Sequence, residues 1–398
     1  MTTTERAPAV ERPAVQPKLG RHLRARSLRW RDLLRPVGIL LASRLLMLMV
    51  LGLAKNVIHS IPLFPASWDG GWYLNAAQHG WPHTVPVAGG HVASSTLAFF
   101  PTFPVLIRAV HLVVPVSWAH AGDGAALLSE VTMAVAFWVL TRDIWDGEVA
   151  DRATLLLCLF PGAFIFALIY AEPLLITLAA ICIYALRKGH WEIAGLAAAL
   201  ATATRPNGVA LVACCAWEAY RAIRARREWR SLIAPVLAPA GIVAWFAYLW
   251  ATTGSAFAWF RTEQGGWGEK IDPFALGHLI MNDLRHPLLY PNLYVPLLGT
   301  LGVVIVIVAL IIVMRPSVPA SLRRVPSVLI VFTVVVLVMS LVSKTLGLRP
   351  RFILTAFPLS MVLGYRLRGS AHALVTACFT GLMTMILLVT VATTALVP

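Results

Sequence analysis

Long apolar runs separated by short polar loops dominate the chain, and this pattern predicts a bundle of membrane-spanning helices. The predicted spans are 37–53, 122–141, 153–170, 172–187, 192–205, 207–220, 232–252, 288–314, 325–343, 350–365 and 371–397. The two spans on either side of Arg205 are too short to cross straight, so we expect a tilted or broken pair there. The prediction is therefore an all-α polytopic membrane protein with about eleven transmembrane helices and a long first loop.

The segment before the first apolar run has a different character. Residues 1–36 are polar and basic and contain prolines, which is typical of a disordered N-terminal segment preceding one transmembrane domain, 37–398. Arginines from Arg21 to Arg35 recur at near-helical spacing, as in an amphipathic segment that rests on anionic lipid. Because the first apolar run starts late and lacks a small-residue cleavage site, we expect no cleavable signal peptide.

Basic residues fix the expected orientation, because loops rich in lysine and arginine face the cytoplasm. The basic residues of alternate loops are Arg142, Arg152, Arg187, Lys188, Arg221, Arg224, Arg226, Arg227, Arg230, Arg315, Arg323, Arg324, Arg366 and Arg368. They place the N-terminus in the cytoplasm and the loop 55–121 on the extracytoplasmic side. Within that loop, 97–116 is apolar but carries two prolines, and we expect a re-entrant or juxtamembrane helix there. A full span at this point would turn every later basic loop outward.

The composition supports a membrane protein: 59% of residues are hydrophobic, 13% are charged and the mean hydropathy is +0.76. The formal net charge of +15 would suit nucleic acid. The basic residues instead lie in loops between apolar runs, so no nucleic-acid partner is expected. All five cysteines lie in apolar runs without a Cys-x-x-Cys pair, which indicates packing residues and neither a disulfide framework nor a zinc site.

One segment of the long first loop, 67–82, is both polar and rich in aromatic residues. Asp69 is its only carboxylate, and two glycines follow, so nothing bulky blocks a close approach to the acid. Trp68 and Trp72 flank it. These features suit a catalytic acid, but they equally suit an interfacial loop in which Asp69 caps a helix.

Other polar residues are expected on the same face as Asp69. Glu172 and Arg205 stand at tight turns between predicted spans, and the loop 253–287 contributes Gln264 and Trp267. A simpler interpretation makes Glu172 the cap of the following helix and lets the Arg205 side chain extend to the membrane interface.

The turn before the tenth predicted span carries Lys344, Arg349 and Arg351, although the expected orientation places it outside. Two explanations are open. Either the charges are tolerated outside because the loop is short, or they bind an anion. Phosphate is the natural anion at a membrane surface, and arginine binds it with two parallel hydrogen bonds. Together with Asp69, these cations would supply the base and the clamp for transfer from a phosphate-linked donor to a hydroxyl.

Two further groups of residues have simpler interpretations. Arg44 and Glu130 lie within predicted spans, where we expect them to face the bundle interior and to pair as a structural element. His79, His83 and His91 share the first loop but lack the tight spacing of metal ligands. A divalent metal therefore has no clear ligand set, and no metal site is assigned.

The ordered motifs, from about residue 40 to 370, resemble the PIG-V-type mannosyltransferases of the GT-C superfamily. The motifs are Trp68-Asp69-Gly-Gly-Trp-Tyr-Leu; His79-Gly80-Trp81; Ala98-Phe99-Phe100-Pro101-x-x-Pro104; Phe160-Pro161-x-Ala163-x-Phe166 with Tyr170-x-Glu172; Thr204-Arg205-Pro206-Asn207-Gly208; Gln264-x-x-Trp267-Gly268; and Arg349-Pro350-Arg351-Phe352. The composition, rich in alanine and arginine, indicates a bacterial member, for which a glycosylphosphatidylinositol acceptor is not expected.

The resemblance implies a GT-C-like bundle in the cell membrane that moves mannose, with inversion, from a polyprenyl-phosphate donor to an extracytoplasmic glycolipid or glycan. It implies that the acid of the first outer loop is the general base. The expected site residues are Asp69 as base; Arg349, Arg351 and Arg205 at the donor phosphate; and Trp68, Trp72, Glu172, Gln264 and Trp267 at the substrates. Some relatives carry an acidic pair where this loop has one acid, which leaves metal dependence open.

Two rival functions remain at this point. A lipid-linked sugar transporter or flippase would need polar residues that reach the inner face, whereas these cluster outside. A non-catalytic subunit of a surface-glycan complex would leave Asp69 dispensable.

Overall fold

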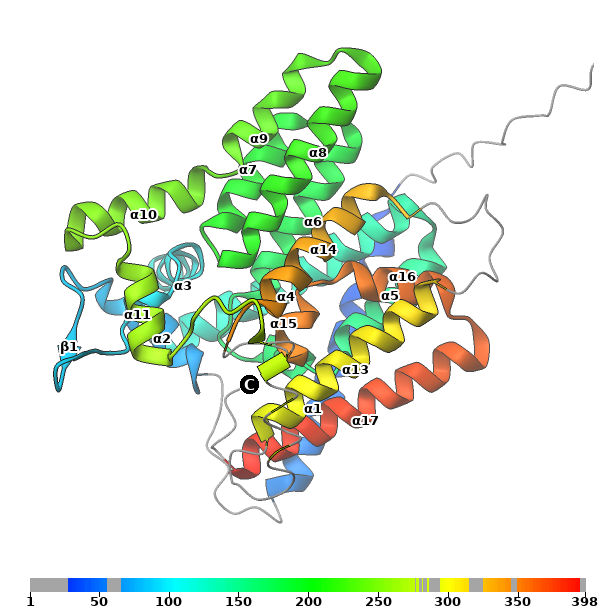
Figure 1. Ribbon diagram of the computed structural model, residues 1–398. Helices are drawn as coiled ribbons and strands as arrows, with labels where there is room; N and C mark the ends of the chain where they lie inside the picture. The colour runs from blue at the N-terminus through cyan, green and yellow to red at the C-terminus, as the bar shows by residue number, and fades with distance from the viewer. Residues whose placement is uncertain are drawn as a thin grey trace, which may run out of the picture.

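The computed structural model describes residues 28–55, 66–275, 294–314, 325–344 and 349–393, with residues 277, 278, 281 and 285 between them. The described chain is almost entirely helical (Figure 1). Its α-helices are α1 Leu34–Lys55, α2 Asp69–His79, α3 Thr102–Val113, α4 Trp118–Ile144, α5 Gly147–Cys158, α6 Glu172–Lys188, α7 Trp191–Thr202, α8 Val209–Arg226, α9 Ile233–Leu237, α10 Ala240–Thr253, α11 Ala258–Trp267, α13 Tyr294–Met314, α14 Ser327–Leu341, α15 Pro350–Leu354, α16 Pro358–Arg366 and α17 Gly369–Thr393.

Short elements join these helices. The 3-10 helices are η1 Trp30–Leu33, η2 Thr96–Ala98, η3 Ala163–Ala167, η4 Pro206–Gly208 and η5 Trp229–Leu232, and the strands β1 Val87–Ala88 and β2 His91–Val92 pair antiparallel. Of the predicted N-terminal segment, residues 1–27 lie outside the described residues. Its last residues form η1 and the start of α1.

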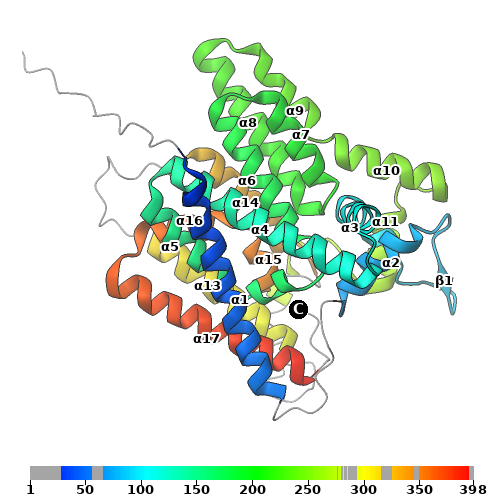
Figure 2. The ribbon, with the colours of Figure 1, turned by 180° about the vertical axis from the view of Figure 1, so that it is seen from behind.

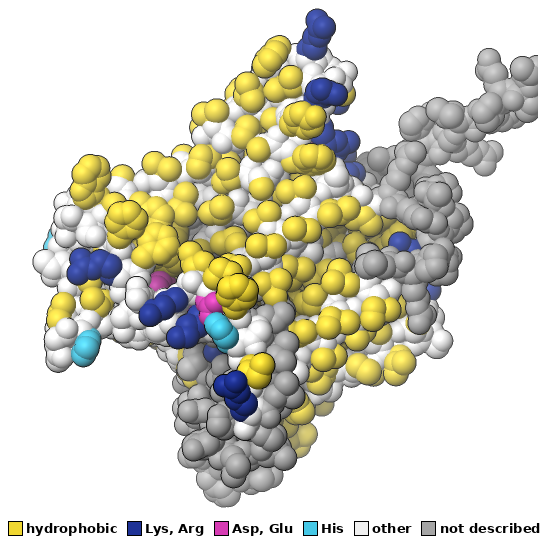
Figure 3. Space-filling view, viewed as in Figure 1, with side chains coloured by type: hydrophobic (Ala, Val, Ile, Leu, Met, Phe, Trp, Pro, Cys, Tyr) yellow, Lys and Arg dark blue, Asp and Glu magenta, His cyan; other side chains and the backbone are white. Residues whose placement is uncertain are grey.

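Four helices in the described part of the chain are long and apolar enough to cross a membrane: Trp30–Ala54, Trp118–Ile144, Trp229–Thr253 and Gly369–Val391. Hydrophobic side chains are spread over the described part of the face shown in Figure 3. Figure 2 shows α1 running along the bundle beside α5 and α17. The prediction of an α-helical membrane protein is confirmed.

Three predicted spans are not single helices, and proline explains each break. The predicted span 153–170 becomes α5 and η3, separated at Pro161, and the predicted span 350–365 becomes α15 and α16, with Pro358 opening the second helix. The predicted span 232–252 lies within the apolar helical run Trp229–Thr253, which is long enough to cross a membrane but bends at Pro239 between α9 and α10. For the other two spans the prediction of one continuous helix was wrong, because hydropathy over a window does not register a change in helix direction.

After the break at Pro239, α10 turns away from α9 and lies beside α3 and α11 at the edge of the bundle (Figures 1 and 2). Its buried Trp245 and Leu249 pack on Leu97 and Phe100 of the first loop. This helix therefore covers the loop that carries the first predicted site residues.

The helix α3 within the first loop contains 12 residues. At 1.5 Å per residue it is about 18 Å long, too short for a hydrocarbon core of about 30 Å. It packs against α2 and α4. Its expected re-entrant or juxtamembrane placement stays a prediction.

Charged residues gather at two opposite ends of the bundle. At one end, ion pairs connect η1 with the end of α4 (Arg142–Asp32, 3.5 Å), α1 with α5 (Arg35–Asp151, 3.2 Å) and the ends of α4 and α6 (Arg187–Asp143, 3.3 Å). Helix α6 ends here and begins at the opposite end of the bundle, 17 residues or about 25 Å away. The starts of α2, α6 and α15 meet at that other end.

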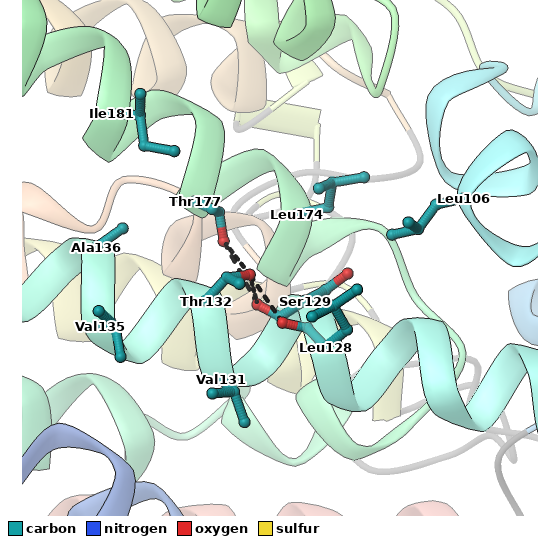
Figure 4. Close-up of a pocket in the computed structure, with 10 residues that line it drawn as sticks. All are labelled: Leu106, Leu128, Ser129, Val131, Thr132, Val135, Ala136, Leu174, Thr177 and Ile181. Atoms are coloured by element: carbon teal, nitrogen blue, oxygen red, sulfur yellow. Dashed lines mark hydrogen bonds between the residues drawn. The ribbon is translucent and has the colours of Figure 1, made fainter. Parts of the chain in front are cut away.

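A groove of about 480 Å³ lies on the side of the bundle between α4 and α6 (Figure 4). Its lining is apolar apart from three hydroxyl-bearing residues, of which Thr132 and Thr177 have their Oγ1 atoms 3.3 Å apart. No ionisable side chain lines it among the described residues, so it offers nothing to a phosphate.

Candidate active site

Asp69 is the first residue of α2, and an unusual backbone conformation precedes it. Trp68 has φ 54° and ψ −120°, a strained combination for a residue with a Cβ atom. The turn is closed by hydrogen bonds from the Gly70 and Gly71 amides to the carbonyl oxygens of Ser67 and Trp68, at 3.1 and 3.3 Å. The turn directs the Asp69 side chain, 21% exposed, into the interior instead of over the helix end.

The helix-cap interpretation of Asp69 does not hold. Trp68 occupies the N-cap position, and no side-chain cap hydrogen bond is present there. The Asp69 carboxylate instead accepts a hydrogen bond from Arg351, whose Nη2 lies 2.5 Å from its Oδ2. The contact joins residues at opposite ends of the sequence.

Arg351 is the centre of the cluster and is only 5% exposed. Besides Asp69, it donates from Nε to Oε1 of Glu172, at 2.5 Å. Its guanidinium also lies over the ring of Tyr170, with Cζ 4.4 Å from the ring centroid. One arginine thus connects the starts of α2, α6 and α15.

Arg205 adds a second cation to the same buried acid. Its Nη1 lies 3.0 Å from Oε1 of Glu172 and donates to the Tyr73 hydroxyl at 3.4 Å. Glu172 is fully buried, and its Oε2 has no hydrogen-bond partner in the described part of the chain. Burial raises the pKa of Tyr73, so this hydroxyl stays neutral and can donate.

Close backbone contacts fix the position of Arg351. Gly162, in the break after α5, lies so near that an added Cβ would come within 2.7 Å of the Arg351 backbone nitrogen. The next residue, Ala163, presents its carbonyl oxygen to Arg44 Nη1 at 3.5 Å. The motif Phe160-Pro161-Gly162 thus forms the wall against which α15 starts.

Arg349 stands two residues before Arg351, at the N-cap of α15. Burial and the charge of Arg351 lower the pKa of Arg349 to about 10. The two guanidinium groups repel each other, and the negative charges of Glu269 and Asp69 oppose that repulsion. A turn that carries two arginines suits an anion.

Aromatic side chains form a wall beside Asp69. The Trp72 ring lies 6.1 Å from that of Phe99 and 5.6 Å from that of Trp267. Trp68 instead packs against the main hydrophobic core. Gln264 lies exposed on α11, one turn before Trp267.

Two glycines dock α11 onto the first loop. A Cβ at Gly265 would come within 2.6 Å of Val92, and a Cβ at Gly266 within 2.7 Å of Ser94. The Ser94 hydroxyl donates to the Gly266 carbonyl oxygen at 2.9 Å. Helix α11 thus has a fixed position, with its Trp267 on the wall near Asp69.

The structure places Tyr73, Tyr170 and Glu263 at this site, and the sequence analysis gave none of them a role. Both tyrosines stand in the motifs that carry the family resemblance, Tyr73 after Trp72 and Tyr170 before Glu172, and that position was the available signal. Glu263 stands four residues before Trp267, and that helical spacing would have placed both on one face. Within the described residues no group of three or more metal-ligating side chains occurs.

Comparison with known proteins adds a family and a fold. The sequence matches the family model described as mannosyltransferase (PIG-V) over residues 49–253, just over half of the chain. No curated protein matches the chain.

Among solved structures, ArnT from Cupriavidus metallidurans bound to undecaprenyl phosphate superposes with a TM-score of 0.50 at 14% identity, covering 85% of this chain and 62% of that one. ArnT in the apo state gives a TM-score of 0.49 at 16% identity, with 83% and 60% covered. The chain thus spans about three fifths of the length of ArnT. At this identity the likeness concerns the fold.

Proposed function

The chain belongs to the mannosyltransferase (PIG-V) family, and from that premise we propose that it transfers mannose from a polyprenyl-phosphate donor to a glycolipid or glycan acceptor. It is a glycosyltransferase of the membrane. The observation that carries the proposal is the convergence of Asp69, Glu172, Arg205 and Arg351 at one end of the bundle. A solved structure with the same fold holds undecaprenyl phosphate, which supports a donor of that lipid class.

The proposed reaction inverts the sugar. The acceptor hydroxyl attacks the anomeric carbon from the face opposite the phosphate, and the electron pair of the breaking bond leaves on the phosphate oxygen. Asp69 accepts the hydroxyl proton, because it is the partly exposed acid of the cluster. The reaction gives free polyprenyl phosphate and the mannosylated acceptor.

The arginines are assigned to the phosphate. Arg351 and Arg349 sit on one turn, and Arg205 reaches the same cluster through Glu172. Positive groups held in a buried site stabilise the charge that develops on the leaving phosphate more strongly than they would in water. Glu172, fully buried and bonded to both Arg351 and Arg205, is assigned to holding these cations in place.

The aromatic wall is assigned to the sugars. Trp72 and Trp267 present ring faces and edges beside Asp69, with Gln264 on the same helix as Trp267. Trp68 is also assigned a positioning role, because its strained backbone conformation sets the direction of the Asp69 side chain.

The decisive experiment supplies radiolabelled polyprenyl-phosphate-mannose to membranes that contain the protein. We expect label to move into an extractable glycolipid or glycan while polyprenyl phosphate is released. Label that stays on the donor, with membranes from cells lacking the chain as reference, would contradict the proposal. Transfer of another sugar from the same lipid in place of mannose would correct the donor only.

The active site is proposed to face the extracytoplasmic side, with the N-terminus in the cytoplasm, because basic loops gather at the opposite end of the bundle. A reporter that is active only outside the cytoplasm should be active when fused after residue 90 or 270. It should be silent after residue 228 or 320. Activity after residue 228 would reverse the orientation of the whole site.

A further inference from the structure

We propose that Glu263 is a second catalytic carboxyl, which receives from Asp69 the proton that the acceptor hydroxyl has lost. This inference rests on the proposed function of Asp69 and extends it. Glu263 belongs to no matched motif, and the cluster around Arg351 does not include it.

Helix geometry turns Glu263 toward the site. Residues four apart share a helix face, so Glu263 faces the same way as Trp267. Trp267 contacts Trp72, three residues after Asp69. Because Gly265 and Gly266 hold α11 against the first loop, this placement is fixed and not a loop position.

Glu263 differs from the other two acids in its partners. Asp69 and Glu172 are each bound by Arg351, whereas Glu263 is half-buried and forms no ion pair within the described residues. An unpaired carboxyl in a partly dry site favours its neutral form. It is therefore the acid of the three that binds a proton near neutral pH.

Electrostatics supports the same assignment. Burial, and then the negative charges of Asp69 and Glu269, raise the pKa of Glu263 to about 8, and Arg205 opposes them. The elements packed against α11 add His91 on β2 and Tyr248 on α10, and α11 itself carries Arg261. The carboxylate of Glu263 consequently binds a proton more strongly than an ordinary glutamate does.

The proton has a reason to leave Asp69. A protonated Asp69 is neutral and would no longer balance the buried charge of Arg351. Passing the proton to an ionised Glu263 restores the Asp69–Arg351 ion pair before the next turnover. The step breaks the O–H bond on Asp69 and forms one on Glu263, and Glu263 later releases the proton to water.

This role predicts a distinctive pH dependence. The receiving form is the ionised one, so its fraction rises with pH through about 8 and is about one in ten at pH 7. The test measures release of polyprenyl phosphate from polyprenyl-phosphate-mannose by membranes with wild-type protein, Glu263→Gln or Glu263→Asp, between pH 6 and 9. We expect Glu263→Gln to be about tenfold slower than wild type at pH 9 and equal to it at pH 6. Glu263→Asp should restore part of the rise.

Other outcomes overturn the proposal. A deficit that is the same at every pH would indicate a structural role. A deficit greatest at pH 6 would make Glu263 a hydrogen-bond donor. As a control, His91→Gln removes the imidazole on β2, the neighbouring group whose ordinary pKa lies within the tested range, and should leave the pH profile unchanged.

An Asp69→Asn variant in the same series separates the two proposals. If it is slow at all pH values while Glu263→Gln behaves as wild type, Asp69 keeps its role and only the relay fails. If Asp69→Asn is fully active, the proposed function of Asp69 fails.

Discussion

The described part of the chain contains two buried arginine–carboxylate groups that differ in construction. In the first, Arg44 of α1 pairs with Glu130 of α4, with Nε and Oε2 2.7 Å apart and with side chains 13% and 5% exposed. This pair joins two neighbouring helices within the bundle, as the sequence analysis expected. In the second, Arg351 holds Asp69 and Glu172 together.

The second group contains more residues than the first and is more exposed to solvent. It joins several segments of the chain, leaves Oε2 of Glu172 without a partner among the described residues, and leaves Asp69 21% exposed. Each group leaves one buried atom without a hydrogen-bond partner among the described residues, Nη2 of Arg44 in the first and Oε2 of Glu172 in the second. The second group is therefore the one that a substrate can reach, because Asp69 is partly exposed whereas Glu130 is buried.

The largest effect on transfer is expected from Asp69→Asn. Asparagine keeps the size and the hydrogen-bonding shape of aspartate but cannot accept the proton. A positioned base typically contributes ~10²–10⁴-fold, so transfer should fall at least about a hundredfold while the protein still inserts and binds donor lipid. Asp69→Glu should keep little activity, because the longer side chain displaces the carboxylate. Near-normal transfer by well-inserted Asp69→Asn would remove the catalytic role.

A smaller loss is expected from Arg351→Ala. Removing a charged, two-point contact should cost on the order of 2–3 kcal/mol of donor binding, or about 30- to 150-fold in affinity. Arg351→Lys should lose less donor affinity than the alanine variant but should not reach the wild-type affinity. A lysine ammonium carries the charge but cannot make the two parallel hydrogen bonds of a guanidinium group. Binding of labelled donor to purified protein measures both. Equal affinity in wild type and Arg351→Ala would take the phosphate away from this turn.

Gly162→Ala should slow transfer by about tenfold, because a displacement near 1 Å at a site can cost about a hundredfold and this one is smaller. The new methyl group would press on the backbone of Arg351. Gly381→Ala in α17 is the matched control, since no atom lies within 4 Å of its added Cβ. Equal rates in the two variants would show that α15 has room to adjust.

The smallest effect on transfer is expected at the first pair. Either Arg44→Met or Glu130→Met alone should cost about 3–5 kcal/mol of stability, because each leaves an uncompensated buried charge. The double variant should recover most of that stability and transfer mannose within about threefold of wild type. Thermal unfolding and transfer assays on the three proteins measure this. A hundredfold loss of transfer in a stable double variant would show that the Arg44–Glu130 pair, like the group around Arg351, is needed for the reaction.

Local signals in the sequence sufficed to predict the membrane helices, one buried ion pair and several residues of the candidate site. Apolar runs predicted membrane helices, and intramembrane charge predicted the pairing of Arg44 with Glu130. Turn residues beside helix starts pointed to Asp69, Glu172, Arg205 and Arg351 as one group. Such features are visible along the chain because each rests on residue type, spacing and the cost of charge in lipid.

The tertiary structure decided what these residues do to one another. Asp69 and Arg351 are 282 positions apart, and their contact depends on the breaks after α5 and before α16 and on the backbone at Gly162. The bend at Pro239 likewise sent α10 across the first loop, and with it α11 and Glu263 toward the site. The sequence determined which charges are too costly to leave unpaired in a membrane. Only the packing of distant helices decided which partners they find within the described part of the chain.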